Sequence, residues 1–179
     1  MKKTILTYGF ISGALIAVMM SLSMAFHRQL GFDKGLIFGY TTILLSMSLI
    51  FFGIKSYRDR VANGSVTFGR AFLIGLLIAA VSSACYVTVW LIIYYNWMPD
   101  YLQQYGDYVV DKMKAAGETT DAINKKVEEM KKFEEMYQNP LVNAAMTFTE
   151  PFPVGIVIAL ISALILKRKN QTKSETITT

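Results

Sequence analysis

The chain has 179 residues, 53% of them hydrophobic, with a formal net charge of +5, one cysteine and one histidine. A single cysteine excludes a disulfide within the chain, and one cysteine with one histidine cannot supply a zinc site built on His and Cys ligands. The apolar residues form four runs that lack the polar face of a soluble helix. This pattern is typical of a polytopic helical membrane protein and argues against a soluble domain.

Four membrane spans are predicted from these runs. A bilayer core needs about 20 apolar residues in a helix, and the first three runs meet that length. The fourth run, Phe152 to Leu166, is shorter, so its span must extend back through Pro151 and Glu150 to near Thr147. The predicted spans lie at about 4–26, 35–54, 71–95 and 147–166, and a tail follows at 167–179.

The first run could also be interpreted as a signal peptide. Lys2 and Lys3 form a charged start, and Ser23-Met24-Ala25 is a passable cleavage site. The apolar part of a signal peptide is usually about 7–15 residues, and this run is longer. We therefore expect a retained span, with cleavage as the alternative.

The basic residues predict the orientation of the spans. The N-terminus, the loop from Lys55 to Arg70 and the C-terminal tail carry ten Lys and Arg against Asp59 and Glu175. The other two loops carry more acidic than basic residues. Because basic segments stay cytoplasmic, we expect both termini inside, in a bacterial inner membrane. The positive charge then indicates attraction to membrane lipids rather than to nucleic acid.

The segment 99–140 is charged and predicts an extracytoplasmic amphipathic helical hairpin between spans three and four. Gly117 is placed to end a first helix, and Thr119 or Thr120 to cap a second. Each helix has apolar residues at three- and four-residue spacings. The hairpin is either a docking surface or a pore cap, or its apolar faces pack together or lie on the outer leaflet. The fold class is therefore all-α: a four-span helical integral membrane protein with this hairpin.

Small residues recur every four positions in three spans, which favours close helix packing because helices in lipid associate through backbone approach. The pattern leaves open whether these seams lie within one chain or between chains. The predicted packing residues are Gly9, Gly13, Ala17, Gly75, Ala79, Gly155 and Ala159.

One segment carries a family resemblance. The motif Lys55-Ser56-Tyr57-Arg58-Asp59, then Asn63-Gly64, then Thr67-Phe68-Gly69-Arg70-Ala71-Phe72 resembles the bacterial membrane family catalogued as domain of unknown function 4199. The resemblance covers nearly the whole chain and implies a small four-span membrane protein. It implies no activity, cofactor or catalytic residue.

Two residues are candidates for function. Glu150 is the only acid within a predicted span, and intramembrane ionisable groups often mark functional sites, although a carboxylate near a helix start is also favoured by the helix dipole. His27, past the end of the first span, is either a plain interfacial residue or a pH sensor. No catalytic, cofactor or metal motif is recognised, so we expect no enzyme. The sequence favours a structural, accessory or partner-binding membrane protein, with membrane lipids, a second copy or another membrane protein as partners. The alternative is a small oligomeric transporter or channel using Glu150.

Overall fold

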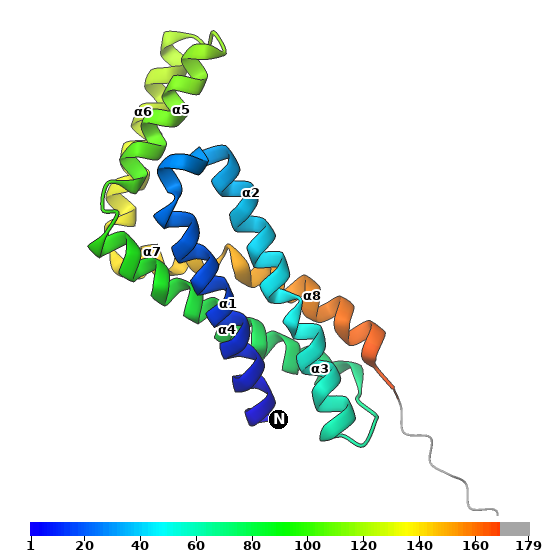
Figure 1. Ribbon diagram of the computed structural model, residues 1–179. Helices are drawn as coiled ribbons and strands as arrows, with labels where there is room; N and C mark the ends of the chain where they lie inside the picture. The colour runs from blue at the N-terminus through cyan, green and yellow to red at the C-terminus, as the bar shows by residue number, and fades with distance from the viewer. Residues whose placement is uncertain (169–179) are drawn as a thin grey trace, which may run out of the picture.

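The structure is a computed structural model that describes residues 1–168, apart from the side chains of His27 and Arg28. Within those residues it is all-α, with eight helices and no strand. The N-terminus, the end of the last helix and the short loop 61–67 lie at one end of a helical bundle (Figure 1). The helical hairpin projects from the opposite end. The remainder of the predicted tail, 169–179, lies outside the described residues.

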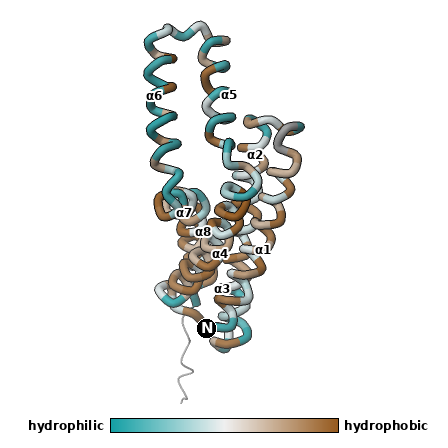
Figure 2. The backbone as a smooth tube through the Cα atoms, turned by 90° about the vertical axis from the view of Figure 1, so that its left-hand side faces the viewer, coloured by the Kyte–Doolittle hydropathy of each residue, from teal (hydrophilic) through white to brown (hydrophobic). Residues whose placement is uncertain are grey.

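Four helical segments are long and apolar enough to cross a membrane, which confirms the predicted number of spans. α1 (Lys2–Ala25) forms the first, α2 (His27–Met47) and α3 (Leu49–Arg60) together form the second, and α4 (Phe68–Asn96) forms the third. The chain is therefore a multi-pass membrane protein. In Figure 2 these segments are mostly hydrophobic, whereas the hairpin is mostly hydrophilic.

The helical segment that contains the predicted second span, 35–54, extends beyond it at both ends. α3 continues to Arg60, through residues that the sequence placed in a loop, because neither Gly nor Pro occurs between Gly53 and Gly64. The chain then turns at Asn63 and Gly64, which have φ values of 49° and 81°. The connection between the second and third spans is consequently short.

The helical segment that contains the predicted fourth span, 147–166, also begins before it. α7 (Pro140–Phe148) follows the hairpin directly, with the Asn139 side chain accepting a hydrogen bond from the Leu141 amide at 3.0 Å. α8 (Pro151–Leu166) continues it after a break at Thr149 and Glu150. The break has a local cause, since Pro151 and Pro153 have no N–H to continue the helical hydrogen-bond ladder.

α4 is the central helix, and small residues set its distance from its neighbours. A Cβ atom added to Gly13 of α1 would lie 2.6 Å from the Cβ of Cys85, and one added to Gly9 would lie 2.7 Å from that of Val81. On the other side, a Cβ on Gly75 would lie 2.7 Å from that of Ala159. Such distances forbid a larger side chain without helix movement.

The remaining predicted packing residues lie along the same helices. A Cβ added to Gly155 would lie 2.6 Å from that of Ala79, whereas Ala17 is half-buried on α1. Both seams of α4 thus lie between helices of one chain. Buried polar contacts join α1 to both α4 and α2, since the Ser82 hydroxyl donates to that of Ser12 at 2.9 Å and Ser12 donates to the Ser46 carbonyl at 2.7 Å.

The hairpin consists of α5 (Tyr101–Ala115) and α6 (Thr120–Tyr137). Gly117 adopts a φ of 74° in the turn, and the Thr119 hydroxyl caps α6 by accepting from the Ala122 amide at 3.3 Å. α5 and α6 pack against each other, and their apolar residues are half-buried between them. Of the uses predicted for the apolar faces, mutual packing is the one that the structure displays.

Candidate functional site

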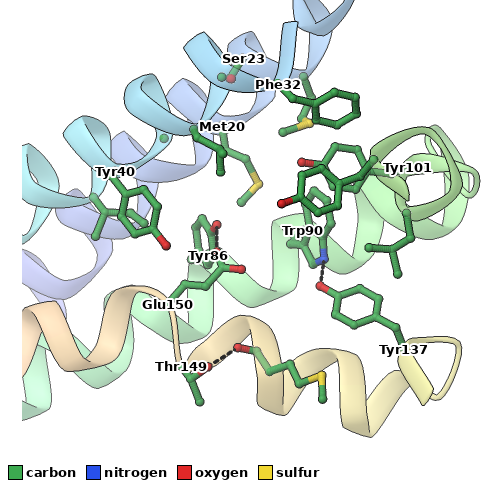
Figure 3. Close-up of a pocket in the computed structure, with 18 of the residues that line it drawn as sticks. Met20, Ser23, Phe32, Tyr40, Tyr86, Trp90, Tyr101, Tyr137, Thr149 and Glu150 are labelled. Atoms are coloured by element: carbon green, nitrogen blue, oxygen red, sulfur yellow. Dashed lines mark hydrogen bonds between the residues drawn. The ribbon is translucent and has the colours of Figure 1, made fainter. Parts of the chain in front are cut away.

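A cavity of about 480 Å³ lies beneath the base of the hairpin. One wall comes from α1 and α2, and the facing wall comes from α4 and the α7–α8 break, while α5 and α6 close the hairpin side. Figure 3 shows aromatic side chains from several of these elements around the Glu150 carboxylate. The lining is otherwise mostly apolar and includes Met20, Met24, Leu36, Ile43 and Met146. The cavity therefore combines a single acid with an apolar surround.

Glu150 is placed in this cavity by the break between α7 and α8. Its backbone occupies the N-cap position of α8, yet its side chain caps no backbone N–H there. Instead, one carboxylate oxygen accepts a hydrogen bond from the Tyr86 hydroxyl at 2.6 Å. This is a short hydrogen bond between a phenol and a carboxyl group. The carboxylate is thus aimed at the cavity by α4.

The aromatic wall is held by hydrogen bonds behind it. Trp90 donates its indole N–H to the Tyr137 hydroxyl at 2.8 Å, and that hydroxyl lies 2.9 Å from the Thr147 hydroxyl. Thr147 donates to the side-chain oxygen of Asn143 at 3.2 Å, so its one proton is used and Tyr137 must be the donor to Thr147. This chain of bonds joins α4, α6 and α7, and it fixes the Trp90 ring at the cavity surface.

Two phenols from the hairpin belong to the same wall. Burial, with the nearby Glu150 charge as a smaller contribution, raises the pKa of Tyr101 to about 12. Burial likewise raises the pKa of Tyr137. Both side chains are therefore neutral phenols at physiological pH. The Tyr101 ring packs edge-on against Trp90, with centroids 5.2 Å apart.

The hairpin is also attached to the start of α2. Gly31 has a φ of 67° and ψ of 171°, which breaks the helix and turns the chain just before Phe32. Phe32 contacts the rings of Tyr105 and Tyr108 on α5, with centroids 5.4 Å and 4.9 Å away. An exposed ion pair between Lys112 and Asp33, at 2.7 Å, lies beside this ring cluster. These contacts set the position of α5 relative to the spans.

A model of the family described as "Protein of unknown function (DUF4199)" matches residues 7–168. The chain belongs to the DUF4199 family. No match was found among curated proteins or among solved structures. Membership of DUF4199 confirms the resemblance seen in the second-loop motif and brings no activity with it.

The motif that resembles DUF4199 lies at the end of the bundle opposite the cavity. Tyr57 is buried in the main apolar core, and Asn63-Gly64 makes the turn that starts the return to α4. Val66 forms a two-bond bridge with Arg168, at 2.9 and 3.1 Å between backbone atoms. In this DUF4199 chain the motif thus builds the turn between spans two and three and contributes no side chain to the cavity.

The two functional candidates from the sequence have different outcomes. Glu150 lines the cavity, whereas His27 begins α2 and its side chain is outside the described part of the chain. Among described residues, no group of three or more His, Cys, Asp or Glu side chains is arranged to hold a metal ion. The structure therefore draws attention to Glu150 and its surroundings.

The aromatic partners of Glu150 in this DUF4199 chain were not predicted from the sequence. Trp90, Tyr94, Tyr95 and Trp97 lie near the end of the third span, where aromatic residues commonly form an interfacial belt. Trp90 and Tyr94 are in fact 8% and 4% exposed, whereas Tyr95 and Trp97 are 41% and 71% exposed. A signal was present, since Tyr86 and Trp90 continue the three- and four-residue spacing of Ala79 and Ser83 along one face of α4.

Proposed function

We propose that this protein is a non-enzymatic accessory protein of the bacterial inner membrane that binds a small, mostly apolar molecule in the cavity beneath its hairpin. The single observation that supports this proposal is the cavity itself. Its volume falls within the range of about 300–1,000 Å³ that is usual for ligand pockets, and its lining is apolar with a few placed polar groups. The proposed site therefore has the size and chemistry of a ligand pocket.

The way in which the cavity is closed suggests how binding could be transmitted. Tyr101 and Tyr105 of α5 and Phe133 and Tyr137 of α6 line it together with residues of the spans. A bound molecule would contact both the hairpin and the spans, so its binding would favour one position of the hairpin over others. A partner that docks on the hairpin, either a second copy or another membrane protein, would then respond to occupancy.

The charge distribution supports an orientation in which the termini are cytoplasmic and the hairpin is outside. In that orientation the cavity lies towards the outer leaflet. A transporter that uses Glu150 is the second candidate, and the observation that favours it is the carboxylate facing a cavity within a candidate span. In both cases the first step is binding in the cavity.

Binding can be measured with Trp90 as the reporter. The chain has two tryptophans, and Trp97 lies outside the cavity, so a Trp97→Phe protein places the only indole at the cavity wall. The probes are ω-bromodecanol, ω-bromodecanoate and ω-bromodecyltrimethylammonium, whose bromine quenches indole fluorescence on contact. The protein is held in an uncharged maltoside detergent, so that the three probes experience the same background.

The matched variants are Gly39→Phe and Gly69→Phe. A Cβ on either glycine meets no atom within 4 Å, but Gly39 lines the cavity and Gly69 lies at the far end of α4. We expect saturable quenching by at least one probe, lost in Gly39→Phe and kept in Gly69→Phe. Quenching that is unsaturable for every probe, or equal in the two variants, would contradict the proposal.

A further inference from the structure

We propose that the cavity is specific for an amphipathic organic cation, an alkyl chain that carries an ammonium group, with the ammonium held by Glu150 among aromatic rings. This inference rests on the proposed function and names the ligand class of the same site. The charge in the cavity is unbalanced. Glu150 is an acid in a mostly apolar cavity, and no ion pair joins it to a lysine or arginine among the described side chains.

The hydrogen bonds within the protein leave most of the carboxylate available. An ionised carboxylate accepts up to about four hydrogen bonds, and Tyr86 supplies one of them. Two neighbouring polar groups are engaged elsewhere, since the Trp90 N–H donates to Tyr137 and the Tyr137 hydroxyl donates to Thr147. Glu150 is an exposed residue, so a cation that enters the cavity can reach its carboxylate and form a charge-assisted contact with it.

The surrounding rings favour an organic cation over a metal ion. Figure 3 shows Tyr40, Tyr86, Trp90 and Tyr101 around the Glu150 side chain. The face of an aromatic ring attracts a cation, and aromatic cages are a recurrent way to bind ammonium groups. Calcium and magnesium require about six or more oxygen ligands, whereas this site offers one carboxylate.

The rest of the cavity accounts for the alkyl chain. Next to the ring cluster, the lining is made of flexible and aliphatic side chains, including Met20, Met24, Ile43 and Met146. Thioether side chains adapt to ligands of irregular shape. One acid at one place and an extended apolar surface beside it match a molecule with a single charged head and an apolar tail.

The test uses the Trp97→Phe protein and the three brominated probes described above. We expect ω-bromodecyltrimethylammonium to bind at least about tenfold more tightly than ω-bromodecanol, and ω-bromodecanoate to bind most weakly. In Glu150→Gln the preference for the cation should disappear, while ω-bromodecanol binding stays within about twofold of its original value. Gly69→Phe should behave as the parent protein does.

The comparison of probes on the parent protein needs no change at Glu150, so it remains decisive if Glu150→Gln fails to fold. Glu118→Gln removes an exposed acid that does not line the cavity, so it is the matched control for Glu150→Gln and should keep the cation preference. If all three probes bound with equal affinity, and Glu150→Gln bound them as the parent protein does, the cation assignment would be overturned and the proposed function would stand. Loss of all saturable quenching would overturn both.

Two competitors distinguish the source and the kind of cation. Decylphosphocholine carries the same ammonium on a lipid-like headgroup, so competition equal to that of decyltrimethylammonium would support a lipid as the source, and weaker competition a free amine. Sodium chloride and choline chloride are compared at equal ionic strength. Choline should displace the probe better, whereas stronger displacement by sodium would overturn the assignment in favour of an inorganic cation.

Discussion

The two ends of the bundle are packed in different ways. At the end that carries the N-terminus and the loop 61–67, α4 meets α8 at Gly75 and Ala159, and the buried core around them is mostly aliphatic. At the hairpin end, the buried cluster contains Trp90, Tyr94 and Tyr137, and a cavity adjoins it. Small residues allow backbones to approach and leave no space, whereas large rings that are fixed by hydrogen bonds hold helices apart. We interpret the first end as the structural part of the molecule and the second as the part that binds.

We expect the two ends of the bundle to lie on opposite sides of the membrane. A reagent that cannot cross the membrane should then label cysteines at one end and not at the other. In a Cys85→Ser protein, single cysteines are introduced as Val61→Cys and Glu118→Cys, both at exposed positions. A membrane-impermeant thiol reagent added to whole cells should label the cysteine at 118 and not the one at 61, because the basic segments stay cytoplasmic. Labelling at 61 alone would reverse the orientation.

The largest effect on stability is expected at the close-packed end. Gly75→Leu must move α8 away from α4, since even a Cβ would lie 2.7 Å from that of Ala159. We expect a loss of about 3 kcal/mol in the free energy of unfolding, the upper end for overpacking. The control is Gly35→Leu at the hairpin end, where a Cβ meets no atom within 4 Å and a smaller loss is expected.

The readout is reversible unfolding in mixed detergent micelles. If Gly35→Leu destabilised the protein as much as Gly75→Leu, the close-packed end would not be distinguished by its small-residue seams.

An intermediate effect is expected from the hydrogen bonds behind the aromatic wall. Tyr137→Phe leaves the Trp90 N–H without its acceptor and Thr147 without a donor. Because both partners are buried, we expect a loss of about 2 kcal/mol. Ser82→Ala, which removes a single buried hydroxyl contact to Ser12, should cost less than about 1 kcal/mol. The same unfolding measurement applies, and equal losses would mean that the network at the hairpin end adds no stability of its own.

The smallest effect is expected at the exposed ion pair between Asp33 and Lys112. Its hydrogen bond to Asp33 raises the pKa of Lys112, so the pair stabilises the protein below the ordinary lysine value and is lost as the pH rises further. Lys112→Met should therefore lower the thermal midpoint slightly, by an amount that is constant at neutral pH and falls at high salt. The ordinary pKa of lysine is about 10.4, so the shift in thermal midpoint should not vary between pH 6 and 8. A shift that changes within that range would contradict this account.

The sequence predicted the spans and the hairpin because local rules determine them. Apolar runs determine where spans lie, and Gly117 and Thr119 determine the hairpin turn. The helices that contain the second and fourth spans extend beyond the predicted 35–54 and 147–166, because helices continue through polar residues such as Lys55–Arg60 and resume after a break such as Thr149–Glu150. The cavity depends on which rings of α4 face the hairpin, and tertiary packing decides that. Glu150 could be selected from its position, but its contact with Tyr86, 64 positions earlier, could not.

The central claim, that the hairpin end binds a ligand and the other end does not, is tested most directly by hydrogen–deuterium exchange with and without decyltrimethylammonium. The account predicts slower exchange at 86–90 and at the hairpin base, 101–105 and 133–137, with no change at 66–79 or 155–166, because the cation occupies the shared cavity. Glu150→Gln should show weaker protection at the same concentration of decyltrimethylammonium, because it has lost the preference for the cation. Protection spread evenly over both ends, or confined to segments outside the cavity, would contradict the account.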